Sequence, residues 1–385
     1  MGHSRLLGIF VVLSLCLSIP SNADTGEIQK DGIWALSMSG DCRFLLAQPS
    51  WNHYVVLDSA TLEQISPTIE LEHVQAATLS YDGGRLALTD SNAKLSIFDT
   101  KSGKPISSAV IPVPLKPRTG GDLEVRFLTY SHDGQEIIVV THELIVILNG
   151  ATGKEITRID SPEIWKMPFE WAQLSPDKSQ LLTAYWTMHP PSLWDAHTGK
   201  LLRTFDDPAG RQTAAMSVHL SPDGKLEAAG EEVFDDATKG WIHLLRVREC
   251  QSGRIVTQLE FETNVRAVAF SRDGKQIAAA DRMARVFDVS TGKSVTTGLG
   301  NGMMWDDKVR DLAFSPDGKY LMSCAPTGFT MVWEMRTQQL LLKVGEVDKF
   351  IFAGFAGVGH VLITGEANGF GRDVTHALFA RKLPE

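Results

Sequence analysis

A chain of 385 residues has room for two or three ordinary domains or for one large all-β domain. Hydrophobic residues make up 43% and charged residues 22%, which excludes a disordered or collagen-like chain. Because the net charge is −9, a nucleic-acid backbone is not expected as a partner of the whole protein.

Residues 1–23 have the three-part pattern of a secretory signal peptide. Arg5 precedes an apolar run over residues 6–19, and Pro20 followed by Ser-Asn-Ala provides the break and the small residues of a cleavage site. The run is short for an uncleaved anchor, because a spanning helix needs about 20 residues. We therefore expect residues 24–385 to be exported as a periplasmic or secreted chain without a transmembrane segment.

An internal repeat dominates the remaining sequence. Its clearest copy is a Ser-x-Asp-Gly turn at residues 315–318, which follows an alternating apolar segment. The repeated serine position, with Ala356 in its place in the last copy, falls at residues 39, 80, 131, 175, 221, 271, 315 and 356. A period of about 40–50 residues is typical of propeller blades.

A second turn follows each first turn and reads Asp-x-x-Thr-Gly-Lys in its clearest copy, at residues 195–200. Close matches occur at residues 99–104 and 288–293, a near match at 149–154, and partial ones at 58–61 and 334–337. Gly, Asp and Thr supply the positive φ angles and side-chain-to-backbone bonds that tight hairpins need. The segments between turns alternate in polarity, so each unit is predicted to hold four antiparallel strands.

On these motifs the chain resembles the WD-repeat (WD40) β-propeller family over residues 24–385, as an exported bacterial-type member. The best match is residues 193–200, with the Trp194-Asp195 pair, and Trp333-Glu334 is a looser version. The family's Gly-His pair survives only as Glu72-His73, and most units lack the Trp.

The resemblance implies an all-β fold: a single β-propeller of four-stranded antiparallel blades. Eight repeat units favour eight blades, and seven blades are the alternative. Residues 25–29 imitate the outer strand of a unit and are expected to pair with the last blade, which would close the ring. Trp171, Trp194 and Trp333 are expected to be core residues on strands.

No catalytic, cofactor-binding or metal-binding motif is present. The sequence contains neither His-Glu-x-x-His nor Gly-x-Ser-x-Gly, and its histidines do not occur at metal-ligand spacing. The acidic stretch 231–236 is interpreted as part of a solvated loop over residues 230–240, with an ion as the alternative. After the leader, Cys42, Cys250 and Cys324 fall in separate units and are expected to form no disulfide.

The second-to-third strand connections within the units and the connections between units carry the unusual residues. In a four-stranded blade the first-to-second and third-to-fourth strand turns lie at one end, and the longer connections lie at the other. Variable loops on a rigid scaffold commonly bind partners, and Trp and Met are favoured interface anchors. The candidate partner-binding residues are Trp51, His53, Trp165, Met167, Trp186, Met188, Met304 and Trp305.

The sequence therefore predicts a non-catalytic, monomeric propeller that binds a protein partner through its longer connections. One alternative is an exported enzyme of the lactonase or quinone-dependent dehydrogenase type with a site at the central channel. Arg126, Arg266 and Arg310 at the strand starts could then hold an anionic ligand. Another alternative is an accessory factor in cell-envelope assembly, similar to the periplasmic propeller of the Tol system.

Overall fold

The computed structural model describes residues 28–31, 34–111, 125–141, 144–160, 169–185, 189–300, 309, 311–325, 330–344, 350–356, 361–368 and 375–383. In this part of the chain every helix or strand assigned is a β-strand. The strands form eight antiparallel sheets, seven with four strands and one with three. The predicted all-β fold of repeated four-stranded antiparallel units, consistent with a β-propeller, is confirmed.

The described residues fall into two compact units, unit 1 (Met1–Arg158 with Ile351–Leu383) and unit 2 (Ile159–Phe350). The sheets of unit 1 are, in strand order, β2 (Trp34–Met38), β3 (Phe44–Ser50), β4 (His53–Asp58) and β5 (Ile69–Glu70); β6 (Val74–Leu79), β7 (Arg85–Asp90), β8 (Lys94–Asp99) and β9 (Pro105–Val110); β10 (Val125–Tyr130), β11 (Glu136–Thr141), β12 (Leu144–Asn149) and β13 (Glu155–Asp160); and β1 (Ile28–Asp31), β31 (Thr375–Lys382), β30 (Val361–Asn368) and β29 (Phe350–Ala356).

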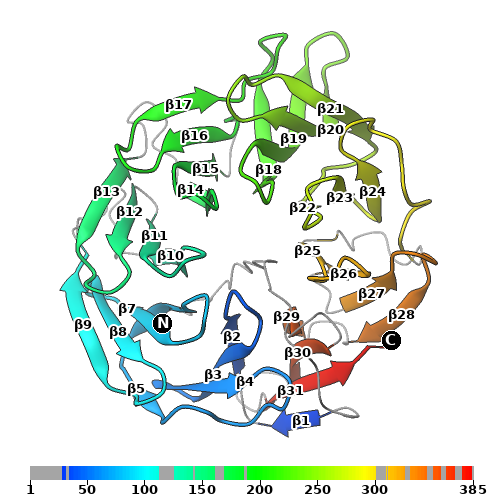
Figure 1. Cartoon of the computed structure of the whole chain (residues 1–385). Coiled ribbons are helices and arrows are strands. Elements are labelled where there is room, and N and C mark those ends of the chain that lie inside the picture. The colour runs from blue at the N-terminus through cyan, green and yellow to red at the C-terminus, as the bar shows by residue number, and fades with distance from the viewer. Residues whose placement is uncertain are drawn as a thin grey trace. The chain divides into compact units, whose positions relative to one another are not determined.

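The sheets of unit 2 are β14 (Phe169–Leu174), β15 (Gln180–Tyr185), β16 (Ser192–Asp195) and β17 (Leu201–Thr204); β18 (Thr213–Leu220), β19 (Leu226–Asp235), β20 (Gly240–Glu249) and β21 (Ile255–Phe261); β22 (Ala267–Phe270), β23 (Gln276–Ala280) and β24 (Ala284–Asp288); and β25 (Asp311–Phe314), β26 (Tyr320–Cys324), β27 (Thr330–Glu334) and β28 (Leu340–Val344). Within each unit the sheets stand side by side, so that β2 and β10 lie on one side of unit 1 and β5, β9 and β13 on the other (Figure 1).

The N-terminal strand joins the last sheet, as predicted. β1 pairs antiparallel with β31, and Ile28 lies opposite Ala380. The strand occupies residues 28–31, slightly later than the predicted 25–29. The fourth strand of this sheet therefore comes from the opposite end of the chain from the other three.

The Ser-x-Asp-Gly turn has the same hydrogen bonds in all seven described copies. In the last of them the Ser315 hydroxyl donates to Asp317 Oδ1 at 2.7 Å and accepts from the backbone N–H of Tyr320 at 2.9 Å. The backbone N–H of Lys319 donates to Asp317 Oδ1 at 3.1 Å. The other six serines that donate to the Asp two residues later are Ser39, Ser80, Ser131, Ser175, Ser221 and Ser271.

The fourth residue of each first turn has a positive φ. Five copies place Gly there, for example Gly318 at 72°, while Cys42 (59°) and Lys178 (61°) occupy the position in the two copies that lack Gly. The turn therefore tolerates a side chain, at the cost of a left-handed backbone that side chains with a Cβ disfavour.

Replacing Gly318 tests this cost without a steric complication, because a Cβ built there meets no atom within 4 Å. Gly318→Ala is expected to lower the free energy of unfolding by about 1 kcal/mol through backbone strain alone. Gly318→Asn should lose less, since Asn visits the left-handed region more readily. Denaturant unfolding of both variants measures the difference, and equal or greater stability of the Ala variant would contradict the explanation.

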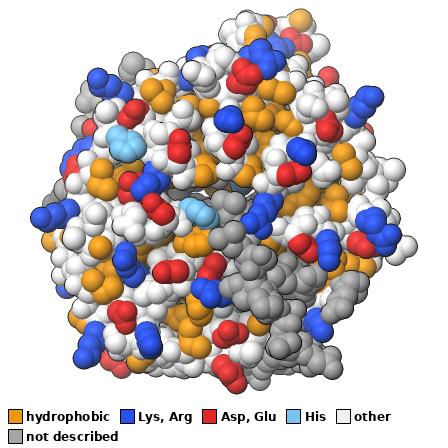
Figure 2. All heavy atoms as spheres, viewed as in Figure 1, with side chains coloured by type: hydrophobic (Ala, Val, Ile, Leu, Met, Phe, Trp, Pro, Cys, Tyr) orange, Lys and Arg blue, Asp and Glu red, His pale blue; other side chains and the backbone are white. Residues whose placement is uncertain are grey.

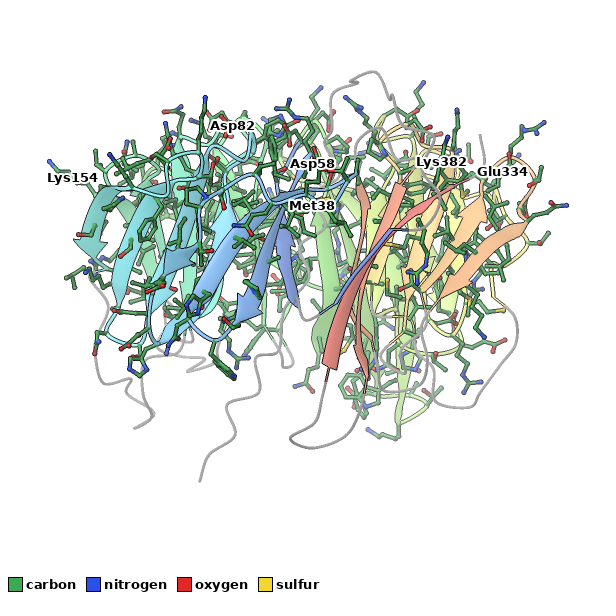
Figure 3. The ribbon with its side chains drawn as sticks, turned by 90° about the horizontal axis from the view of Figure 1, so that it is seen from below. Met38, Asp58, Asp82, Lys154, Glu334 and Lys382 are labelled. Carbon is green, nitrogen blue, oxygen red and sulfur yellow. The ribbon has the colours of Figure 1, made fainter. Side chains whose placement is uncertain are left out.

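The second turn is also built on one carboxylate. Asp195 Oδ1 accepts from the backbone N–H of Thr198 at 2.7 Å and from its hydroxyl at 2.8 Å, and Gly199 has a φ of 70°. The sequence pattern did not reveal the copy at residues 249–254. There the Ser252 hydroxyl donates a hydrogen bond to Glu249 Oε2, and Gly253 has a φ of 72°. In unit 1 the two kinds of turn lie at the same end of the sheets, as the positions of Asp58, Asp82 and Lys154 in Figure 3 show.

Neighbouring sheets are joined at this turn end. The fourth strand of one sheet bonds to the second turn of the next: Ser107 Oγ donates to Ala151 O at 2.8 Å in unit 1. In unit 2, Thr257 Oγ1 donates to Val289 O at 2.5 Å. The apolar faces pack between sheets, and the predicted core position of Trp194 is confirmed, with its Nε1 donating to Thr183 Oγ1 at 2.9 Å. Trp333 is buried as well, whereas Trp171 is only partly buried.

The three-stranded sheet has a substitute for its missing fourth strand. The edge strand β24 is covered by the segment after it: Val295 N–H donates to Val286 O at 2.7 Å, and Val286 N–H donates to the Thr296 hydroxyl at 3.0 Å. The first sheet uses the same arrangement, because Val56 N–H donates to the Ser66 hydroxyl at 2.8 Å. A side-chain oxygen thus satisfies a donor that a fourth strand would otherwise pair.

Thr296→Val removes this acceptor while keeping the side-chain shape. The buried N–H of Val286 would lose its partner, which typically costs about 1–3 kcal/mol. Thr296→Ser, which retains the hydroxyl, is the matched control. Unfolding free energies measured in urea should rank wild type and Ser above Val, and indistinguishable Val and Ser variants would refute the role assigned to the hydroxyl.

The cysteines only partly match expectation. Cys250 and Cys324 are free and buried, as predicted. Cys42 is disulfide-bonded, so the prediction of no disulfide is wrong for this residue. The prediction weighed only pairs among the three cysteines that follow the leader.

The predicted signal peptide, residues 1–23, lies outside the described residues. Over the residues that the structure does describe, no helix combines the length and hydropathy required to cross a bilayer.

Candidate functional site

Two of the eight candidate partner-binding residues lie in the described structure, Trp51 and His53. The other six fall outside it: Trp165, Met167, Trp186, Met188, Met304 and Trp305. The described site therefore consists of the connection ends of the sheets, opposite the short turns, taken separately in each unit. Two connections of this site expose a tryptophan, β3–β4 in unit 1 and β19–β20 in unit 2.

The β3–β4 connection is a two-residue turn that exposes Trp51. Ser50 and His53 pair across the hairpin, and Asn52 takes the left-handed conformation with a φ of 66°. The Trp51 residue is 72% exposed, although large aromatic side chains are usually mostly buried. The tight turn leaves Trp51 at the tip of the hairpin.

His53 holds this turn in place. Its Nδ1 lies 2.7 Å from Trp51 O and 3.0 Å from Ser50 Oγ, and its Nε2 lies 3.4 Å from Glu70 Oε1. The backbone also contributes, because the N–H of Leu71 donates to Asn52 O at 2.9 Å. These contacts fix Trp51 beside the start of the β5–β6 connection, so two of the predicted residues form one arrangement.

The β19–β20 connection differs from the prediction. Residues 230–240 are not an irregular solvated loop: β19 and β20 continue through them as a ten-residue pair, from Leu226 opposite Glu249 to Asp235 opposite Gly240. Glu231, expected in the solvated acidic stretch, is fully buried. Glu231 points into the molecule because Arg246 and Arg248, on the next strand, balance its charge there.

The hairpin tip presents a second aromatic residue. Trp241 is 38% exposed and packs edge-on against Phe234, with ring centroids 5.2 Å apart. In the turn, Lys239 Nζ lies 3.0 Å from Asp236 Oδ1. Sequence reasoning did not select Trp241, although its place beside an insertion in the repeat was a signal that could have identified it.

A buried chain of alternating charges anchors the hairpin. Arg246 bonds Asp207 Oδ1 at 3.1 Å and Glu231 Oε2 at 2.9 Å, and Arg248 bonds Glu231 Oε1 and Glu227 Oε1 at 2.6 Å each. The order from the surface inward is Arg211, Asp207, Arg246, Glu231, Arg248 and Glu227. The chain thereby links the connection before β18 to both strands of the hairpin.

Glu227 is the second residue of its strand, a position at which other sheets carry buried apolar residues such as Ile277 and Leu321. Gln258 accepts from Arg246 Nε at 2.8 Å, and the Phe205 ring lies 5.7 Å from the Arg248 guanidinium carbon. Two nearby carboxylates raise the pKa of Arg248, whose burial opposes them. Removing one member of such a buried network typically costs about 3–5 kcal/mol, because it leaves a charge without its partner. The network consequently holds the β19–β20 hairpin to the connection that precedes β18.

Glu227, at the inner end, gives this chain a pH dependence. Burial raises the pKa of Glu227 to about 7, against the attraction of Arg248 and Arg246 and together with the repulsion of Glu231. Between the unfolded value near 4.5 and 7, the folded protein therefore binds a proton that the unfolded chain does not. The stability contributed by this residue is greatest at acidic pH and falls as pH rises through 7.

Glu227→Gln should abolish this contribution. Between pH 5.5 and pH 8, urea unfolding is expected to show that wild type loses more stability, or gains less, than the variant. Burial lowers the pKa of His219 and raises the pKa of Asp311, and these two residues contribute equally to both proteins. Carboxylates with a lowered pKa, such as Asp177 beside Ser175, give the opposite slope but lose their effect at lower pH. An unchanged difference between the two pH values in the Gln variant would show that Glu227 does not titrate as described.

The residues described offer no cluster of three His, Cys, Asp or Glu side chains suited to a metal ion. Of the arginines proposed for an anionic ligand, Arg126 lies in β10 of unit 1, Arg266 precedes β22 in unit 2, and Arg310 is outside the described residues. Among the described side chains on the face in Figure 2, Lys and Arg are interspersed with Asp and Glu.

Comparison with known proteins gives matches to repeats of one family. Residues 253–288 and 293–334 match the family model "WD domain, G-beta repeat". The chain is 31% identical over 154 residues to "WD repeat-containing protein SL1-17" of Schistosoma mansoni, covering 39% of this chain and 45% of that protein. It is 25% identical over 172 residues to "Eukaryotic translation initiation factor 3 subunit I" of Phaeosphaeria nodorum, covering 42% of this chain and 48% of that protein.

The chain thus spans less than half the length of these curated relatives. Among solved structures, the computationally designed protein Ika8 superposes with a TM-score of 0.57 at 17% identity, covering 77% of this chain and 81% of that one, which supports the fold alone. The matched repeats span β21 to β27, where both turn motifs are present. The similarity to WD40 repeats therefore rests on the matched residues 253–288 and 293–334 and on two relatives that align over part of their length.

Proposed function

We propose that the chain is a non-catalytic scaffold that binds a protein partner through the connection ends of its sheets. Proteins with WD40 repeats generally act as scaffolds for protein interaction, and their stacked units offer broad binding surfaces. The short turns are occupied by hydrogen bonds that form the fold, as at Ser315 and Asp195, which leaves the opposite ends to vary. Loops on a rigid scaffold are where binding usually resides.

The observation that carries the proposal is the exposure of aromatic side chains on rigidly held hairpin tips. Trp51 is clamped by His53, and Trp241 stands on a hairpin anchored by the buried charge chain. A partner that covers them would gain apolar contact without first ordering the tips, and preorganised aromatic anchors are typical of interface hot spots. Residues 1–23 are proposed to direct export, so that residues 24–385 would meet their partner outside the cytoplasm as one propeller domain.

Chemical cross-linking in cells followed by purification and mass spectrometry tests the scaffold. The full-length chain is compared with Trp51→Ala/Trp241→Ala and with a turn-end control, Lys101→Ala/Lys154→Ala, after unfolding curves show all three folded. A partner captured by wild type and control, but reduced at least about tenfold with the tryptophan variant, is expected. Equal capture by all three would remove the connection ends from the binding surface, and no reproducible partner would count against a scaffold.

A further inference from the structure

We propose that the surface around Trp51 in unit 1 binds a Lys/Arg-rich segment of a protein partner. This inference rests on the proposed scaffold function and names the chemistry recognised at one of its tips. We call the surface formed by Trp51, Asn52, Glu70 and Glu72 the Trp51 surface. It is distinct from the β19–β20 hairpin of unit 2.

The first argument is placement. The N–H of Leu71 donates to Asn52 O, which sets the Trp51 turn directly beside the backbone between Glu70 and Glu72. The side chains of these two glutamates are 76% and 80% exposed, and Trp51 is 72% exposed. An aromatic ring and two carboxylates are therefore presented together to solvent.

The second argument is charge. Residues 44–84 contain five acidic residues and no Lys or Arg. The next basic residue, Arg85, points its guanidinium toward Gly134 O and Gly150 O in the neighbouring sheet. Lys94, exposed at the start of β8, is the next basic group along the chain near the connection end. Among the described residues, the basic side chains paired with these two carboxylates are histidines, with His53 Nε2 at 3.4 Å from Glu70 and His73 Nε2 at 4.0 Å from Glu72.

The third argument is the match between this chemistry and a cation. The face of a Trp ring attracts an ammonium or guanidinium group, typically by about 0.5–2 kcal/mol. Carboxylates add charge-assisted hydrogen bonds to the same groups. An acidic segment would be repelled by Glu70 and Glu72, and a purely apolar segment would leave both carboxylates unused. The Trp241 tip lacks this match, because Lys239 already pairs with Asp236 there.

Fluorescence anisotropy with a labelled decapeptide of alternating Lys and Arg tests the proposal, and an all-Glu decapeptide is the negative probe. The full chain is compared with Trp51→Ala, with Glu70→Gln/Glu72→Gln, and with a matched control, Glu260→Gln/Glu262→Gln. The control removes the same charge from two exposed residues of unit 2. Thermal unfolding checks that each variant folds.

We expect the basic peptide to bind at least about fivefold more weakly to both Trp51-surface variants and nearly unchanged to the control, with affinity falling as salt rises. Similar weakening in the control would mean that net charge alone attracts the peptide, and unchanged binding in the Trp51→Ala variant would remove the ring from the site; either result overturns the proposal. The partner capture experiment separates the two claims. Capture that depends on Trp51, without basic-peptide binding there, leaves the scaffold standing and refutes the cationic assignment.

Discussion

Seven of the eight described sheets depend on the hydrogen bond between a turn serine and the aspartate two residues later. In each described copy the serine hydroxyl also accepts from the first backbone N–H of the returning strand, so one side chain fixes both the turn and the strand register. A one-residue slip would turn every apolar side chain of the strand to the wrong face. This explains why Cys42 and Lys178 are forced into a left-handed backbone conformation rather than allowing the turn to change.

The connection ends obey a different constraint, because nothing in the repeat prescribes them. In unit 2 the connection is replaced by a longer β19–β20 hairpin. This hairpin carries a chain of buried charges, each of which needs an oppositely charged partner. At the inner end of this chain Glu227 Oε2 and Arg248 Nε are buried without a hydrogen-bond partner. In unit 1 the connection is built differently, since a two-residue turn and a histidine clamp present a tryptophan.

Sequence alone predicted what the repeat encodes and little of what departs from it. The four-stranded units, both turns and the pairing of the N-terminal strand follow from spacing and turn chemistry. Trp51 and His53 could be selected because they are unusual residues in a second-to-third strand connection. Glu231 could not be placed, because its burial depends on Arg246 and Arg248, which lie on the next strand and are recognisable only once β19 and β20 are paired. Thr296 likewise acts through a backbone partner ten residues away.

The central claim is that one end of each sheet builds the fold and the other end binds the partner. A photo-crosslinking amino acid placed at position 51 on the connection end of unit 1, or at position 102 on its turn end, tests this directly. Because Ser102 belongs to a turn whose bonds are internal to the fold, the two positions differ in the role assigned to them. The account predicts a covalent partner adduct in cells from position 51 and none from position 102. Adducts from position 102 alone would contradict it.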